Sequence, residues 1–169
     1  MGSGKTTVGR VVAEMLGLHF IDVDEAIEER CGVEVDRIFE IEGEAGFRLR
    51  ETQMLDELTQ VSNVVIGTGG GSVLDPANRS FMQDRGFTVW LKTSVGQQLR
   101  RLAKDRRRPL LQTPDREERL QKMASERDPL YALCADMIIP SANVSPNAMG
   151  QRVAQKILEE FNSSSKGIE

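Results

Sequence analysis

The chain has 169 residues, of which 39% are hydrophobic and 28% charged, a balance typical of a folded domain with a sizeable core and not of a disordered chain. Its net charge of −4 gives no overall attraction to nucleic acid or to an anionic membrane, and no apolar run is long enough to cross a bilayer. One histidine, His19, and two distant cysteines, Cys31 and Cys134, leave no ligand set for a zinc cluster. We expect reduced thiols in a cytoplasmic protein, since no secretory signal is visible, and catalysis by carboxylates, Lys, Arg and backbone amides.

The spacing of apolar residues predicts helices alternating with short strands. Helices are predicted at residues 8–16, 24–30, 34–41, 44–60, 76–84 and 94–104, from 116 onward, and near the end of the chain. Strands are predicted at residues 19–23, 64–66, 87–91 and 137–139. The last helix is predicted to bury Met149, Val153, Ile157, Leu158 and Phe161. Asp128 and Pro129 predict a kink or a fresh helix start, 104–115 a mobile loop, and 162–169 a frayed tail.

This alternation predicts an α/β fold in which helices cover both faces of a parallel sheet. No internal repeat and no linker interrupts residues 1–169, so we expect a single domain. Ligands on such sheets bind at the carboxyl ends of the strands, and the polar motifs of this chain fall at those places.

A phosphate-binding loop is predicted at the start of the first helix. Gly2-Ser3-Gly4-Lys5-Thr6 matches the second half of the pattern G-x-x-x-x-G-K-[ST], in which backbone N–H groups and the helix N-terminus hold a phosphate. Lys5 would reach the β- and γ-phosphates and the Thr6 hydroxyl would ligate Mg²⁺; the alternative is a glycine-rich turn before an unrelated helix. The first glycine of the pattern, and the strand that feeds the loop, would precede Met1. We therefore expect Met1 to be an interior residue of a longer natural chain, the alternative being a complete chain of low stability.

Asp22 and Asp24 end the next predicted strand. Strand alternation places both on one face at its carboxyl end, where one would hold Mg²⁺ through water and the other would accept a proton from a hydroxyl. The alternative is a helix N-cap at Asp24 with a solvated Asp22.

Further candidates lie on a helix and after the next strand. Arg48 and Glu51 are three residues apart and could pair on one helix face, which would aim the guanidinium at a carboxylate ligand; a solvated surface pair is the alternative. The triplet Gly69-Gly70-Gly71 follows a buried strand and would let backbone amides approach a ligand, unless it is a plain flexible turn.

Two more arginines are candidates for anion binding. Arg108 closes the basic run 104–108 before Pro109 and would fold over a transferring phosphoryl group. Arg127 is a second candidate carboxylate clamp. For each arginine the alternative is a solvated side chain.

Taken in order, these motifs resemble the shikimate kinase family. The resemblance rests on G-S-G-K-T, the D-x-D at Asp22 and Asp24, F-R-x-x-E at 47–51, T-G-G-G at 68–71, R-P-L-L at 108–111 and R-x-P-L-Y at 127–131. It implies a P-loop NTPase-like three-layer fold with a parallel five-stranded sheet of order 2-3-1-4-5, whose first strand would be the segment missing before Met1. It also implies transfer of the ATP γ-phosphoryl group to the 3-hydroxyl of shikimate, with Mg²⁺, in aromatic amino-acid biosynthesis.

The resemblance also implies roles for individual residues. The catalytic residues would be Asp24 as base, Lys5 and Arg108. Shikimate would be bound by Asp24, Arg48, Arg127 and the glycines Gly69, Gly70 and Gly71. ATP would be bound by Gly2, Ser3, Gly4, Lys5, Thr6, Thr7, Arg101 and Arg108, with Pro146 near the adenine loop. Mg²⁺ would be held by Thr6 and Asp22. The expected partners are shikimate and ATP, with no nucleic acid and no membrane, and the chain is expected to be monomeric.

Two alternatives remain open at this stage. Another metabolite kinase, such as a gluconate kinase, would share the phosphate loop and the lid but should lack the F-R-x-x-E and G-G-G pair. A nucleotide-dependent switch would need a guanine-specific N-K-x-D motif, which is absent from the sequence.

Overall fold

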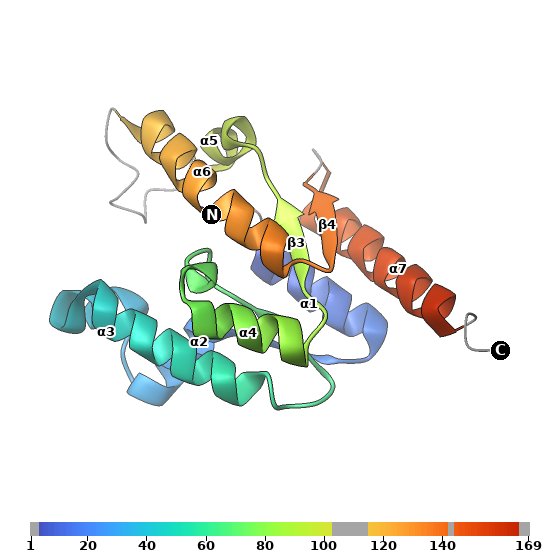
Figure 1. Cartoon of the computed structure of the whole chain (residues 1–169), viewed down its shortest axis with the longest axis horizontal. Helices are drawn as coiled ribbons and strands as arrows, with labels where there is room; N and C mark the ends of the chain where they lie inside the picture. Colours follow the sequence, from blue (N-terminus) through green and yellow to red (C-terminus); the bar gives the residue numbers. More distant parts are fainter. Residues whose placement is uncertain (1–3, 103–114, 142–143, 166–169) are drawn as a thin grey trace.

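The computed structural model describes residues 4–102, 115–141 and 144–165, and Figure 1 shows their arrangement. The helices are α1 (Lys5–Leu16), α2 (Val23–Cys31), α3 (Val35–Leu58), α4 (Pro76–Arg85), α5 (Val95–Leu102), α6 (Arg116–Cys134) and α7 (Pro146–Ser165), with a short 3₁₀ helix, η1 (Ser72–Leu74). The strands are β1 (His19–Asp22), β2 (Val64–Gly67), β3 (Val89–Lys92) and β4 (Met137–Pro140). The predicted lid at 104–115 lies outside the described residues except for Asp115.

The strands pair in parallel, as the alternation of helices and strands predicted. His19 to Asp22 of β1 lie beside Val64 to Gly67 of β2, and β3 lies beside β4 with Val89 opposite Met137. Within the described ranges these are two separate two-stranded sheets. The α/β class is therefore confirmed, while the five-stranded order stays a prediction.

Two hydrophobic clusters hold the helices to these strands. One joins α1 to α7 and β4, and Gly150 makes this contact possible, because a Cβ there would lie 2.6 Å from Val11 Cβ. Its buried members are Val8, Val12, Ile139, Met149, Val153 and Ala154. The other joins α2 to α3, and its buried members are Val23, Ile27, Ile38, Phe47, Met54 and Leu55. Figure 1 shows α2, α3 and α4 grouped on one side, with α7 on the other side next to β4.

Two helices, α3 and α6, differ from the predicted elements. The helices predicted at 34–41 and 44–60 are the two halves of α3, which change direction at Gly43, where φ is 70° and ψ −175°. α6 continues through Pro129, so the fresh helix start predicted at Asp128-Pro129 is wrong, while the alternative of a kink there stays a prediction. Arg127 and Tyr131, on the two sides of this proline, bind the same carbonyl, that of Gly70, which holds both turns in one helix.

The predictions for α7 are wrong at its end. Met149 and Val153 are buried and Ile157 packs on the core, but Leu158 and Phe161 are 46% and 53% exposed. The helix extends beyond the core cluster here, and the Phe161 ring lies against the Phe87 ring with the centroids 5.2 Å apart. The frayed tail expected from 162 is helical through Ser165. No helix in the described part of the chain has the length and apolar character of a membrane span.

Candidate active site

The start of α1 faces the end of β1. Gly4 caps α1 with a φ of 77°, a left-handed conformation that glycine adopts without strain. In the first turn of the helix, the Lys5 ammonium lies 2.8 Å from Asp22 Oδ2, and the Thr6 hydroxyl donates to the same oxygen at 2.9 Å. Lys5 and Thr6 of the predicted phosphate loop thus lie beside the first aspartate.

Asp22 is a buried helix cap. Its side chain is 4% exposed. Its Oδ1 accepts a hydrogen bond from the Asp24 N–H at 3.0 Å, and this cap marks the start of α2. Burial alone would raise the pKa of Asp22, but Lys5, Thr6 and the Asp24 N–H together hold it below its ordinary value. The carboxylate is therefore charged and ordered near neutral pH.

Asp24 occupies a different position from the one that strand alternation predicted. The strand stops at Asp22, and Asp24 lies in the first turn of α2, so the two side chains do not share a strand face. The alternative of an N-cap at Asp24 beside a solvated Asp22 is also wrong, since the cap is Asp22 itself. Burial, reinforced by the carboxylates of Asp22, Glu51 and Glu28 and opposed by Lys5, raises the pKa of Asp24. A carboxylate with a raised pKa is better suited to accept a proton near neutral pH.

Arg48 is held by a buried carboxylate. Its Nη1 donates to Glu51 Oε2 at 2.5 Å, and the Glu51 side chain is 0% exposed, so the alternative of a solvated surface pair is wrong. The other edge of the guanidinium, Nε and Nη2, lies 3.4 Å from Glu44 Oε1. Glu51 thus fixes one side of the planar guanidinium of Arg48. The remaining donors face the exposed carboxylate of Glu44, which an anionic ligand could displace.

The glycine triplet is packed against this pair. A Cβ on Gly69 would lie 2.8 Å from Glu51 Oε1, and a Cβ on Gly71 would lie 2.4–2.6 Å from the Arg48 guanidinium. The absence of side chains therefore makes room for the Arg48–Glu51 pair. Exposure of the triplet's backbone amides to a ligand stays a prediction.

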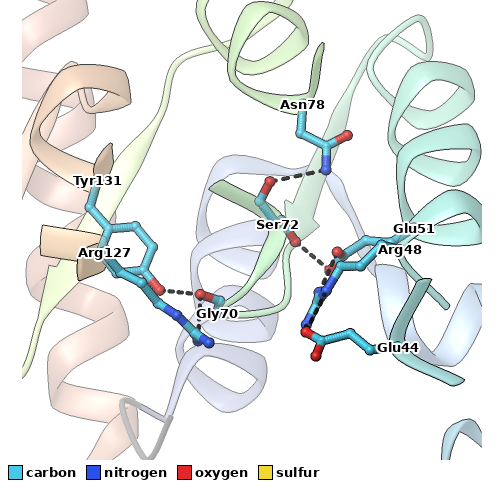
Figure 2. A network of polar contacts seen from close by, with 8 residues as sticks. All are labelled: Glu44, Arg48, Glu51, Gly70, Ser72, Asn78, Arg127 and Tyr131. Carbon is cyan, nitrogen blue, oxygen red and sulfur yellow. Dashed lines mark hydrogen bonds and ion pairs between the residues drawn. The ribbon is translucent and has the colours of Figure 1, made fainter. Parts of the chain in front are cut away.

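Arg127 approaches the triplet from α6. Its Nη1 donates to the Gly70 carbonyl at 3.0 Å, and the Tyr131 hydroxyl donates to the same oxygen at 2.5 Å. Figure 2 shows these two side chains on one side of the triplet and the Arg48–Glu51 pair on the other. Burial, opposed by the nearby Arg127, raises the pKa of the Tyr131 phenol, so it stays a neutral donor.

Several contacts of this site were not singled out from the sequence. Ser72 donates to Glu51 Oε1 at 2.5 Å, and Asn78 donates to the Ser72 carbonyl at 3.0 Å. Tyr131 could have been found, because it stands four residues after Arg127 on the same helix face. No comparable spacing from a candidate site residue points to Ser72 or Asn78 in the sequence.

The remaining candidates are less well placed. Thr7 lies exposed on α1, Arg101 lies in the last turn of α5, and Pro146 opens α7. Gly2, Ser3 and Arg108 lie outside the described residues.

The oxygen atoms near Lys5 fit a magnesium ion. The Thr6 hydroxyl and the Asp22 carboxylate are hard oxygen ligands within 2.9 Å of each other. Among the described residues, no group of three His, Cys, Asp or Glu side chains could form an all-protein cage. A site with few protein oxygens suits Mg²⁺, which keeps waters and takes its other ligands from substrate phosphates.

These features define a class of protein. A lysine and a threonine at a helix N-terminus, facing a buried aspartate at the carboxyl end of a parallel strand, form the site of a P-loop phosphotransferase.

Comparison with known proteins gives the particular family. The model of the shikimate kinase family matches residues 1–162. The chain is 50% identical over 157 residues to the shikimate kinase of Halorhodospira halophila, covering 93% of this chain and 89% of that protein. It is 48% identical over 162 residues to the shikimate kinase of Aromatoleum aromaticum, covering 96% and 92%. The chain belongs to the shikimate kinase family.

Solved structures agree with this assignment. Shikimate kinase from Acinetobacter baumannii in complex with shikimate superposes with a TM-score of 0.88 at 44% identity, covering 95% of this chain and 89% of that one. The enzyme from Bacteroides thetaiotaomicron gives 0.82 at 37% identity, covering 94% of each chain. The predicted family is confirmed, and neither alternative is favoured.

Proposed function

We propose that this chain transfers the γ-phosphoryl group of ATP to the 3-hydroxyl of shikimate, giving shikimate 3-phosphate and ADP in aromatic amino-acid biosynthesis. The observation that carries the proposal is the Arg48–Glu51 pair, packed against the glycine triplet opposite Arg127. Two arginines beside one glycine triplet suit an acceptor with a carboxylate, and the structural neighbour from A. baumannii is in complex with shikimate.

The roles of the acceptor-side residues follow from their surroundings. Asp24 contacts the shikimate hydroxyls and accepts the proton as the 3-oxygen attacks the γ-phosphorus. Arg48 and Arg127 bind the carboxylate, and the backbone of Gly70 lies beside the ring. Arg127 must exchange part of its contact with the Gly70 carbonyl for the ligand.

The roles of the ATP-side residues are assigned in the same way. Gly2, Ser3, Gly4 and Thr7 line the phosphate loop, and Lys5 stabilises charge on the γ-phosphoryl oxygens. Its ammonium leaves Asp22 for the phosphate, while Thr6 and Asp22 hold Mg²⁺, whose charge offsets that of the transferring group. Arg108 binds the phosphates from the lid and Arg101 lies against the adenine.

The sheet is proposed to have five strands in the order 2-3-1-4-5, where strand 1 is the expected upstream strand and β1 to β4 are strands 2 to 5. In the described residues β2 pairs only with β1, and β3 only with β4, so each pair has an edge open to a further strand. The side chains of Val64, Val65 and Ile66, and of Val89 to Leu91, are half-buried, although strands this apolar are usually covered. A chain extended by an upstream apolar strand should melt at a higher temperature and bind ATP more tightly; equal stability and ATP affinity without it would refute the order.

The chain is proposed to act as a single domain, as a monomer and in the cytoplasm. Sedimentation of the purified protein tests the monomer, since a mass of two chains at assay concentration would refute it.

The function itself is tested with a coupled ADP-release assay. We expect ADP release that depends on shikimate and on Mg²⁺, with little release from gluconate or from ATP alone. Release at the same rate without shikimate would refute the proposed acceptor.

A further inference from the structure

Glu51 is a buried carboxylate whose two oxygens have different partners. Oε2 accepts from Arg48 Nη1 at 2.5 Å, and Oε1 accepts from the Ser72 hydroxyl at 2.5 Å. Both Glu51 and Ser72 are 0% exposed, so water does not replace either contact. A buried charge of this kind is stable only when its lone pairs are occupied.

Ser72 is itself fixed by the next helix. Its carbonyl accepts from Asn78 Nδ2 at 3.0 Å, and Asn78 on α4 is 1% exposed. Its backbone N–H donates to the Gly69 carbonyl at 3.2 Å, which closes the glycine turn. Figure 2 shows the resulting line of contacts from Asn78 through Ser72 and Glu51 to Arg48.

We propose that Ser72 is a positioning residue for acceptor binding: its hydroxyl fixes Glu51, and Glu51 fixes the fork of Arg48. This inference rests on the proposed function. Among the described residues, Ser72 is the donor to Glu51 Oε1, so without its hydroxyl this oxygen loses its partner and the carboxylate can rotate away from its present plane. Arg48 would then be free to turn toward Glu44, which already lies 3.4 Å from its Nε and Nη2.

Losing the orientation of Arg48 weakens binding of the acceptor by the same amount in the ground state and in the transition state. A contact of that kind changes KM and leaves kcat in place. Because a hydrogen bond to a charged group is at stake, we expect Ser72→Ala to raise KM for shikimate about tenfold, with kcat and KM for ATP within about twofold of the unsubstituted chain.

The experiment measures steady-state kinetics with shikimate and ATP varied separately. Ser80→Ala is the matched control, because the Ser80 hydroxyl also donates to a carboxylate, that of Asp84, at 2.7 Å on the exposed face of α4. Ser72→Cys keeps the side-chain volume with a weaker donor, and we expect a smaller rise in KM. If Ser72→Ala fails to fold, Ser72→Cys decides the question.

A purely structural role is separated by a double mutant. In the Arg48→Lys background, where the fork is already lost, Ser72→Ala should raise KM by less than about twofold. An unchanged KM in folded Ser72→Ala, or in Ser72→Cys where it alone folds, overturns the role of Ser72, as does a tenfold effect that persists in the Arg48→Lys background. Absence of shikimate-dependent turnover in the unsubstituted chain overturns the proposed function and this inference with it.

Discussion

Arg48→Lys separates an acceptor clamp from a general positive charge. The Arg48 side chain is 25% exposed, and its Nη1 is committed to the fully buried Glu51, which leaves Nε and Nη2 for a ligand. Lysine has one nitrogen and cannot hold Glu51 while offering a second, parallel donor pair. The loss is that of a largely desolvated charged contact, about 2–4 kcal/mol, which corresponds to a fall of about 30- to 800-fold in kcat/KM for shikimate.

The assay is steady-state kinetics with shikimate and ATP varied separately. KM for ATP should barely change, because Lys5 at the start of α1 pairs with Asp22, whereas Arg48 on α3 pairs with Glu51 and Glu44. Arg50→Lys is the matched control two residues away. Arg50 pairs with Glu42 on the same helix, where the two side chains are 38% and 35% exposed, and its substitution should leave KM for both substrates unchanged. If Arg48→Lys weakened binding of ATP as much as binding of shikimate, or weakened neither, Arg48 would not be an acceptor clamp.

Substitution of Glu51 should also lower kcat/KM for shikimate, by a smaller factor. Glu51→Ala removes the partner that aims Arg48 but leaves the guanidinium itself, so kcat/KM for shikimate should fall less than in Arg48→Lys. The double mutant should fall by less than the product of the two single effects, because both changes act on one contact. Strictly multiplicative effects would show that Glu51 does not act through Arg48.

Three further predictions concern the phosphate side, the base and α6. Lys5→Ala should lower kcat about 100-fold, or about 3 kcal/mol, with the fold intact, and near-normal turnover of the folded variant would contradict its role. Because burial and nearby carboxylates raise the pKa of Asp24, Glu28→Gln should lower that pKa and move the acid limb of the kcat/KM profile for shikimate to lower pH, whereas Glu29→Gln should not. Tyr131→Phe should lower the free energy of unfolding in urea by about 1 kcal/mol, and an unchanged value would show that its buried hydroxyl contributes nothing.

Periodicity predicted the order of helices and strands in this chain because most elements have one strongly apolar face. It failed where a local polar contact competes with the apolar pattern. Val23 extends the apolar run of β1 and reads as strand, but it is the first residue of α2, because the Asp22 carboxylate caps the helix at the Asp24 N–H. The D-x-D pattern was therefore misleading about the geometry of Asp22 and Asp24.

The prediction of burial at the end of α7 failed for a different reason. Leu158 and Phe161 continue the helical spacing of Met149, Val153 and Ile157, so the sequence alone gives no sign that burial stops. Burial depends on how far the partner elements reach, which is a property of the packed core and not of α7.

The glycine triplet marks the limit of what its sequence could predict. Three glycines after a strand indicate a close approach of some kind, and the expected partner was a ligand at the backbone amides. In the structure Gly69 and Gly71 make room for the carboxylate of Glu51 and the guanidinium of Arg48, which lie about 20 residues earlier in the chain. No local pattern links these positions, since the pairing depends on α3 packing beside the turn after β2. The same contact is the basis of the role proposed for Ser72: once the glycines make room for a buried carboxylate, its second oxygen needs a hydrogen-bond donor, and Ser72, which follows the triplet, supplies it.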